Sequence, residues 1–276
     1  MKPRSLWEAA RERSLQALRS GALEPIPTRC ERLEDAGVAF TARVRTGEGA
    51  KERATASDRR TGRNPFLPYD EELLVGPIGA THVALLNKFP VLEPHLLVVT
   101  RVFEEQESLL TPEDFEALFH VLDEVDGLGF YNAGAVAGAS QPHKHLQVVA
   151  SPAAGWPVER LLPPASAETT RSSGLPLQHA LAPSPFARAA RGPASETLYL
   201  EMLRAVGQPS DPRAYNLLAT RRWLLLIPRS RASLAGIPVN ALGFAGVFLV
   251  RDEHELATLR RMGPLKLLNG VARSGG

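Results

Sequence analysis

The stretch GASQPHKHLQVV, residues 138–149, decides how this sequence is interpreted. It begins with small residues and ends in the alternation that is typical of a β-strand. Successive side chains of a strand point to opposite faces, so we expect His143, His145 and Gln147 on one face and Lys144 on the other. The sequence therefore predicts two imidazoles and an amide in a row on one surface of a sheet.

The small residues before the strand predict a site for an anion. Gly134, Gly138, Ala139 and Ser140 have little or no side chain, so their backbone can come close to a ligand. Successive N–H groups in such a loop can surround phosphate oxygens. We expect a phosphate group to bind between this loop and the polar row.

The two histidines have four possible roles. They could be hydrogen-bonded structural residues, or ligands of a metal ion, which needs further ligands. They could act in general acid–base catalysis, or one could attack phosphorus to form a covalent phosphoramidate. No Cys, Asp or Glu occurs between residues 127 and 157. That absence weakens the metal site, and the small-residue loop favours nucleophilic attack.

Composition narrows the class of protein. The chain has 276 residues, of which 44% are hydrophobic and 22% charged, as in globular proteins. Its net charge of +2 provides no strong field for nucleic acid or an anionic membrane, so we expect neither as a partner. The single cysteine, Cys30, excludes an internal disulfide framework. No apolar run approaches the roughly 18 residues that span a bilayer, and we expect a cytoplasmic protein.

Periodicity predicts a mixed architecture. Residues 5–20 are expected to form an amphipathic helix, and Thr111 and Pro112 to begin another. Apolar runs at 82–87 and 95–100 predict neighbouring strands, and the pair 214–220 and 223–228 predicts two more. Because strands and helices do not alternate regularly, the fold class is α+β with an antiparallel sheet and flanking helices.

A change in composition divides the chain. Residues 152–194 are rich in Pro, Ala, Ser and Gly, which predicts a long exposed connection. We therefore expect an N-terminal catalytic half at 1–151 and a C-terminal half at 195–276 that contributes substrate contacts.

Several motifs together resemble one family. These are NPFLPYDEELLVGP, LLNKFPVLEPHLLVVT, FYNAG and GASQPHKHLQVV in the first half, and YNLLATRRWLLLIPRSR and PVNALGFAGVFLV in the second. They resemble the diadenosine tetraphosphate (Ap4A) phosphorylases, or ATP adenylyltransferases, of the histidine triad superfamily. The resemblance implies a histidine-triad-like fold whose two halves pack as one unit.

The resemblance also implies a reaction, the reversible phosphorolysis of Ap4A to ATP and ADP through an adenylyl-histidine. His145 maps to the nucleophile and His143 to a supporting histidine. Gln147 stands where hydrolases of the superfamily have a third histidine. A polyphosphate leaving group needs little protonation, and an amide can still hydrogen-bond the phosphoryl oxygens, so Gln147 favours transfer over hydrolysis.

Further substrate contacts are implied by the alignment with the family. They map to Lys51, Asn87, Lys88, Asn132, Gly138, Ala139, Ser140, Gln141, Gln147, Asn240, Ala241, Leu242, Val247 and Arg251. The family often has Met and Lys at the positions of Val247 and Arg251, although Arg keeps the positive charge. The remaining histidines are expected to be structural or solvated, namely His82, His95, His120, His179 and His254.

The expected partners are small nucleotides and inorganic phosphate. No metal site is expected in the protein itself, although a magnesium or manganese ion could bind together with the polyphosphate. We expect a monomer or a weak homo-oligomer.

Two alternatives remain open. A hexose-1-phosphate nucleotidylyltransferase would share the His-x-His-x-Gln arrangement, but such enzymes usually hold metals through Cys and His clusters that this sequence lacks. A non-catalytic nucleotide-binding module would be expected to lose its nucleophile, and His145 is present.

Overall fold

The computed structural model describes residues 5–47, 63–163, 169, 174–207 and 214–274. Its main element is a sheet with the strand order β3-β4-β5-β7-β6-β9-β10-β8, in which every neighbouring pair is antiparallel. The strands are β3 (Leu74–Ile78), β4 (His82–Leu86), β5 (His95–Thr100), β6 (Gly127–Asn132), β7 (His145–Ala150), β8 (Ala180–Pro183), β9 (Tyr215–Ala219) and β10 (Trp223–Pro228).

The two halves of the chain share this sheet. β6 of the first half pairs with β9 of the second, from Gly129↔Ala219 to Asn132↔Asn216. A smaller sheet repeats the pattern, because β13 (Val247–Val250) lies parallel to β2 (Val38–Arg45), which also pairs with β1 (Thr28–Asp35). The prediction of an α+β fold with both halves packed as one unit is confirmed.

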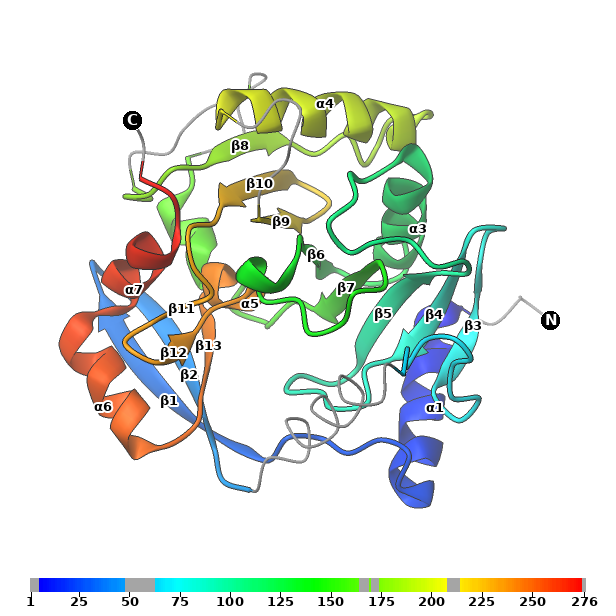
Figure 1. Ribbon diagram of the computed structural model, residues 1–276, viewed down its shortest axis with the longest axis horizontal. Coiled ribbons are helices and arrows are strands. Elements are labelled where there is room, and N and C mark those ends of the chain that lie inside the picture. The colour runs from blue at the N-terminus through cyan, green and yellow to red at the C-terminus, as the bar shows by residue number, and fades with distance from the viewer. Residues whose placement is uncertain (1–4, 48–62, 164–168, 170–173, 208–213, 275–276) are drawn as a thin grey trace.

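Helices cover one face of the main sheet (Figure 1). They are α1 (Leu6–Ser20), α3 (Pro112–Leu122) and α4 (Arg191–Ala205), and they share a hydrophobic core with the strands. The opposite face carries the smaller sheet and the remaining elements, which are α5 (Ala241–Ala245), α6 (Glu253–Met262), α7 (Pro264–Val271), the short pair β11 (Ser233–Leu234) and β12 (Ile237–Pro238), and the 3-10 turns η1 (Ala135–Ala137) and η2 (Pro157–Leu161).

The predicted helix boundaries have identifiable causes. In α1 the Ser5 hydroxyl accepts from the Glu8 N–H while the Glu8 carboxylate accepts from the Ser5 N–H. In α3 the pair Thr111 and Asp114 does the same. Each reciprocal pair satisfies backbone donors that the first helical turn leaves open.

The segment from 152 to 194 differs from the prediction. Its described part is not an exposed connection, because Trp156, Val158 and Leu181 are buried in the second hydrophobic core and β8 forms an edge of the main sheet. The prediction was based on the high Pro and Ala content, and the few apolar residues are spaced too irregularly to indicate a buried segment. The division of the chain into two halves at this segment stays a prediction.

None of the helices in the described part of the chain is both long enough and apolar enough to cross a membrane.

Candidate active site

Strand β7 separates the polar row from the lysine between the two histidines, as predicted. His145 and Gln147 lie on the face opposite the helices, while Lys144 is fully buried among them. Its Nζ lies 2.9 Å from Asp114 Oδ2 and 2.8 Å from Glu104 Oε2. Because a buried charge needs such partners, Lys144 stabilises the back of the site and does not reach a ligand.

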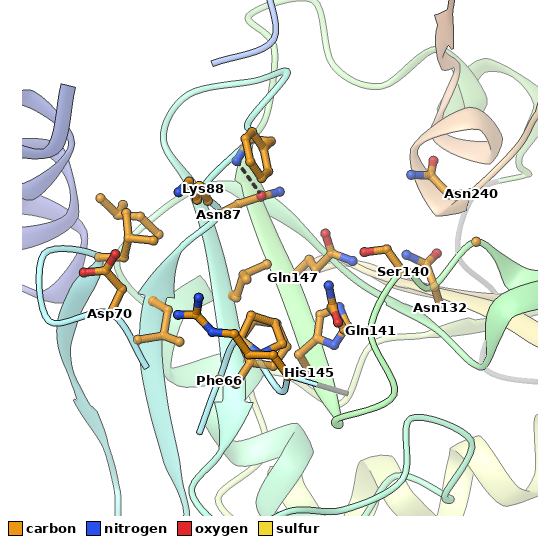
Figure 2. A pocket seen from close by; sticks show the side chains of 18 residues that line it. Phe66, Asp70, Asn87, Lys88, Asn132, Ser140, Gln141, His145, Gln147 and Asn240 are labelled. Atoms are coloured by element: carbon orange, nitrogen blue, oxygen red, sulfur yellow. Dashed lines mark hydrogen bonds between the residues drawn. The ribbon is translucent and has the colours of Figure 1, made fainter. Parts of the chain in front are cut away.

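A cavity of about 340 Å³ opens over this face (Figure 2). Phe66, Leu85 and Leu97, which belong to a small hydrophobic cluster, form part of its wall. Its lining combines apolar and polar side chains: Arg63, Pro65, Phe66, Asp70, Leu73, Leu85, Leu86, Asn87, Lys88, Phe89, Leu97, Asn132, Gly138, Ser140, Gln141, His145, Gln147 and Asn240.

One hydrogen bond sets the tautomer of His145. Its Nδ1 lies 2.8 Å from the carbonyl oxygen of His143, which can only accept. Nδ1 therefore carries the proton, and the lone pair is on Nε2. The Phe66 ring packs against this imidazole with 5.3 Å between ring centroids. The hydrogen bond and the ring contact thus fix the orientation of the His145 imidazole, with Nε2 as its nucleophilic atom.

His143 supports His145 through its main chain. Its own ring donates from Nε2 to the Thr100 carbonyl, at 2.9 Å, and accepts at Nδ1 from the Asn64 amide, at 3.0 Å. Burial lowers the pKa of His143, because the charged form loses its hydration. The orienting role predicted for His143 therefore falls to its carbonyl group, while its imidazole stays neutral and bound to other partners.

The side chain of Gln147 is oriented by a chain of hydrogen bonds. Asn87 Oδ1 accepts from the Phe89 N–H, so the Asn87 amide nitrogen faces His95 Nδ1 at 3.2 Å. His95 then carries its proton on Nε2, which lies 3.0 Å from Gln147 Oε1. Since this oxygen is occupied as an acceptor, the Gln147 amide N–H₂ is the group left to donate to a ligand.

Asn132 presents a second amide in the same way. Its Oδ1 accepts from Asn216 Nδ2, at 2.8 Å, and from the Ala241 N–H, at 3.0 Å. The Asn132 N–H₂ therefore remains for the cavity that this residue lines. Two amide donors, from Gln147 and Asn132, converge on the space beside His145, an arrangement suited to phosphoryl oxygens.

The small-residue loop contributes less backbone than predicted. The N–H groups of Gly138 and Ala139 donate to the carbonyls of Ala135 and Gly134, within the loop itself. Among residues 138–141, Ser140 and Gln141 are the ones whose backbone N–H groups make no backbone hydrogen bond within the described part of the chain. Gly138 is needed for another reason: its φ is +99°, and a Cβ there would lie 2.7 Å from Asn240 Cβ.

Two family models match successive parts of the chain. The Ap4A phosphorylase N-terminal domain matches residues 1–164, and the ATP adenylyltransferase C-terminal domain matches residues 173–274. The chain belongs to the Ap4A phosphorylase family. It is 31% identical over 235 residues to diadenosine 5',5'''-P1,P4-tetraphosphate phosphorylase 2 of Saccharomyces cerevisiae, an alignment that covers 71% of each chain.

Solved structures match along the whole chain. Yeast Ap4A phosphorylase Apa2 in complex with AMP is 26% identical, with a TM-score of 0.84 and coverage of 100% of this chain and 99% of the other. The same yeast enzyme in complex with Ap4A gives a TM-score of 0.81 at 24% identity, with full coverage of both chains. The histidine-triad-like fold is thereby confirmed.

The substrate contacts implied by the Ap4A phosphorylase family are only partly brought together. Asn87, Lys88, Asn132, Gly138, Ser140, Gln141, Gln147 and Asn240 line the cavity. Lys88 Nζ lies 3.4 Å from Glu24 Oε1 and is about half exposed. Ala139 lines a neighbouring cavity, Ala241 and Leu242 are buried beside Asn132, and Lys51 lies outside the described residues.

Val247 and Arg251 lie away from His145. Val247 is on β13, in the smaller sheet, and the Arg251 guanidinium pairs with Glu255. Neither lines the cavity at His145 or its neighbour. Their role as substrate contacts stays a prediction.

The structure adds residues that sequence patterns did not indicate. Arg63 lines both the first cavity and a second one of about 590 Å³, which shares Ser140 and Gln141 with it. No residue in the described part of the chain forms an ion pair or hydrogen bond with Arg63. This guanidinium is thus available to a phosphate that passes from one cavity to the other.

Gln106 is the second unexpected residue. The β6–β7 register ends at Phe130↔Gln147, and its continuation would place Asn132 opposite His145. The Gln106 amide occupies that position: its Oε1 accepts from the His145 N–H, at 2.8 Å, and its Nε2 donates to the carbonyls of Asn132 and His145. Gln106 thereby fixes the main chain of His145 just beyond the last paired residues of β6 and β7. It comes from a loop in which no sequence motif was recognised.

No cluster of three or more potential metal-ligating side chains is found within the described ranges.

Proposed function

We propose that this protein catalyses the reversible phosphorolysis of Ap4A to ATP and ADP through an adenylyl group on His145. The observation that carries the proposal is the combination of a fixed lone pair on His145 Nε2 with two amide donors beside it, from Gln147 and Asn132. Ap4A is the molecule named for the yeast relative and bound in its structure.

The first step is the attack of His145 Nε2 on the α-phosphorus of one adenosine. An N–P bond forms, the bond from this phosphorus to the bridging oxygen breaks, and ATP departs with both bonding electrons. The proton on Nδ1 stays hydrogen-bonded to the His143 carbonyl, which stabilises the positive charge that develops on the imidazole. The leaving ATP is a weak base, so no general acid is required at the third triad position, which is Gln147.

The second step reverses these roles. An oxygen of inorganic phosphate attacks the adenylyl phosphorus, the N–P bond breaks, and ADP is released with neutral His145 restored. The amides of Gln147 and Asn132 bond the phosphoryl oxygens in both steps, where negative charge accumulates in the transition state. A divalent cation would be carried by the polyphosphate, whose charge it reduces.

The two cavities accommodate the two parts of the substrate. The first cavity has an apolar wall of Leu73, Leu85 and Leu97, suited to a purine ring, and its polar end holds His145. Arg63, Ser140 and Gln141 lie where the second cavity begins, so the polyphosphate and, later, the attacking phosphate would pass there. We place this activity in the cytoplasm, with small nucleotides and phosphate as the only partners, in a monomer or weak homo-oligomer.

Incubation with Ap4A, with and without phosphate, tests the proposal. We expect ATP and ADP in equal amounts, formed only when phosphate is present. Two ADP molecules formed without phosphate would indicate hydrolysis instead. Binding of AMP without any turnover would indicate a nucleotide-binding module.

A matched pair of variants tests the covalent step. We expect His145→Ala to abolish turnover and to take up no label from adenine-labelled Ap4A, because the nucleophile is gone. His254→Ala removes an exposed imidazole on α6 and should leave the rate unchanged. Full activity in His145→Ala would rule out the adenylyl-histidine.

A further inference from the structure

A buried arginine lies behind the phosphate site with no acidic partner. Arg229, directly after β10, is 3% exposed, and it forms no ion pair within the described residues. Burial lowers its pKa to about 10, so it remains protonated at neutral pH. Taking an unpaired charge out of water is costly, and a native protein normally supplies a countercharge.

Carbonyl oxygens satisfy the hydrogen bonds of this guanidinium without neutralising it. Nη1 bonds to the Val239 carbonyl, at 2.9 Å, and Nη2 to the Arg231 carbonyl, at 2.8 Å. The ring of Phe244 lies 5.2 Å from the guanidinium carbon. These groups offer partial negative charges only, so the positive charge of Arg229 has no full countercharge within the described part of the chain.

Two asparagines connect this charge with the cavity. Arg229 Nη1 donates to Asn216 Oδ1, at 2.6 Å, and Asn216 Nδ2 donates to Asn132 Oδ1, at 2.8 Å. The orientation of each amide is fixed independently: Asn216 Nδ2 also donates to the Ala137 carbonyl, and Asn132 Oδ1 also accepts from the Ala241 N–H. All donors therefore point in one direction, from the guanidinium toward the Asn132 N–H₂ group and the cavity.

We propose that Arg229 is a positioning and charge-supplying residue for the nucleotide phosphate, and that it acts through the relay Asn216–Asn132. A chain of aligned hydrogen bonds polarises each of its members, so the Asn132 N–H₂ becomes a stronger donor than an isolated amide. The phosphate bound beside Gln147 supplies the countercharge that Arg229 lacks. This inference rests on the proposed function only in taking a nucleotide phosphate as the ligand.

Substitutions of Asn216, the middle residue of the relay, test the proposal. In Asn216→Asp, the carboxylate neutralises Arg229 and can only accept, so Asn132 must turn its amide nitrogen inward and present its oxygen to the ligand. In Asn216→Ala, the relay is cut, but Arg229 stays charged and Asn132 keeps its bond from Ala241. The substitution Asn269→Asp, at an exposed position of α7, is the matched control.

AMP is the probe, with its dissociation constant measured by calorimetry and the melting temperature measured for each variant. We expect Asn216→Asp to weaken AMP binding by about 10- to 100-fold, the range for loss of a charge-assisted hydrogen bond, and Asn216→Ala to weaken it less. Asn269→Asp should bind as the wild type does. If Asn216 were purely structural, the variant with the lower melting temperature would also bind AMP more weakly, whether that variant is Asn216→Asp or Asn216→Ala.

Equal AMP affinity in Asn216→Asp and the wild type would overturn the relay. If neither Asn216 variant folds, Arg229→Lys and Arg229→Met decide, because both lose the planar fork but only Lys keeps the charge. We then expect Arg229→Lys to bind AMP more tightly than Arg229→Met. Equal AMP affinity of the two variants, or loss of folding in both, would overturn the inference. Failure of the proposed function is seen separately, as a wild-type protein that binds AMP but does not turn over Ap4A.

Discussion

Two turns of the same sequence type, Asn64-Pro65-Phe66 and Asn87-Lys88-Phe89, orient the two sides of the active site. In each turn the asparagine oxygen accepts from the phenylalanine N–H, and the amide nitrogen bonds to Nδ1 of a buried histidine. The rings of His143 and His95 therefore have the same tautomer, with the proton on Nε2.

The two turns differ in where that proton points. In the first, His143 Nε2 donates to the Thr100 carbonyl, whose role as an acceptor cannot change. In the second, His95 Nε2 donates to the Gln147 oxygen, and Gln147 faces the ligand. The same local motif thus ends on a backbone carbonyl, that of Thr100, in the first turn and on a side chain that faces the ligand, that of Gln147, in the second. We therefore expect only the second turn to affect catalysis strongly.

Replacement of the Gln147 amide donor by an acceptor should have the largest effect on the rate. In Gln147→Glu, one carboxylate oxygen can still accept from His95, while the other faces the phosphoryl oxygens and repels them. We expect kcat/KM for Ap4A to fall about 10²- to 10³-fold, as when a preorganised donor is lost. Gln16→Glu, an exposed change on α1, is the control. A Gln147→Glu variant with a rate near that of the wild type would show that the amide is not a donor in the reaction.

The same substitution in both turns should have unequal effects. Asn87→Asp offers an acceptor to His95 Nδ1, which moves the ring proton there and forces Gln147 to turn its nitrogen inward. Asn64→Asp does the same to His143, but the Thr100 hydroxyl lies 2.9 Å from His143 Nε2 and can donate to it instead. We expect kcat/KM to fall about 10- to 100-fold in Asn87→Asp and less than about tenfold in Asn64→Asp.

Steady-state kinetics of the two variants side by side decide this prediction. Equal losses would mean that the two turns act in the same way.

The pH dependence of stability should show a smaller effect. Burial lowers the pKa of His143 below the value of about 6.5 for an unfolded chain. As the pH falls through 6.5, the unfolded state takes up a proton that the folded state does not, so the free energy of unfolding decreases. Between pH 7 and 5.5 the free energy of unfolding should therefore fall more for the wild type than for His143→Gln, measured by urea denaturation. Parallel pH curves would contradict the assignment of His143 as neutral.

Features that depend on neighbouring residues in the chain were predicted from the sequence. The alternation along β7 placed His145 and Gln147 together and sent Lys144 to the opposite face, and the capping residues placed α1 and α3. His95 was expected to be structural or solvated, and it is buried. Its hydrogen bond to Gln147 could not be foreseen, because it depends on the register between β5 and β7.

The supporting residues could not be predicted because they come from distant segments. Gln106 replaces a missing ladder contact, and Arg229 is joined to the site through Asn216. No spacing in the sequence indicates these contacts, since they exist only when several strands are assembled. The predicted cradle of N–H groups was partly wrong for a related reason: Gly138 and Ala139 donate to carbonyls within their own turn.

The pairing of β6 with β9 also has a consequence for the order of folding. Asn132 and Asn216, which meet across this pair, are separated by 84 positions in the chain. Closing so long a loop costs entropy before any contact compensates for it, and such pairings form late. A newly synthesised chain can therefore hold His145 on its strand well before Asn132 is oriented. Nucleotide binding that uses the Asn132 amide therefore requires the pairing of β6 with β9 to be complete.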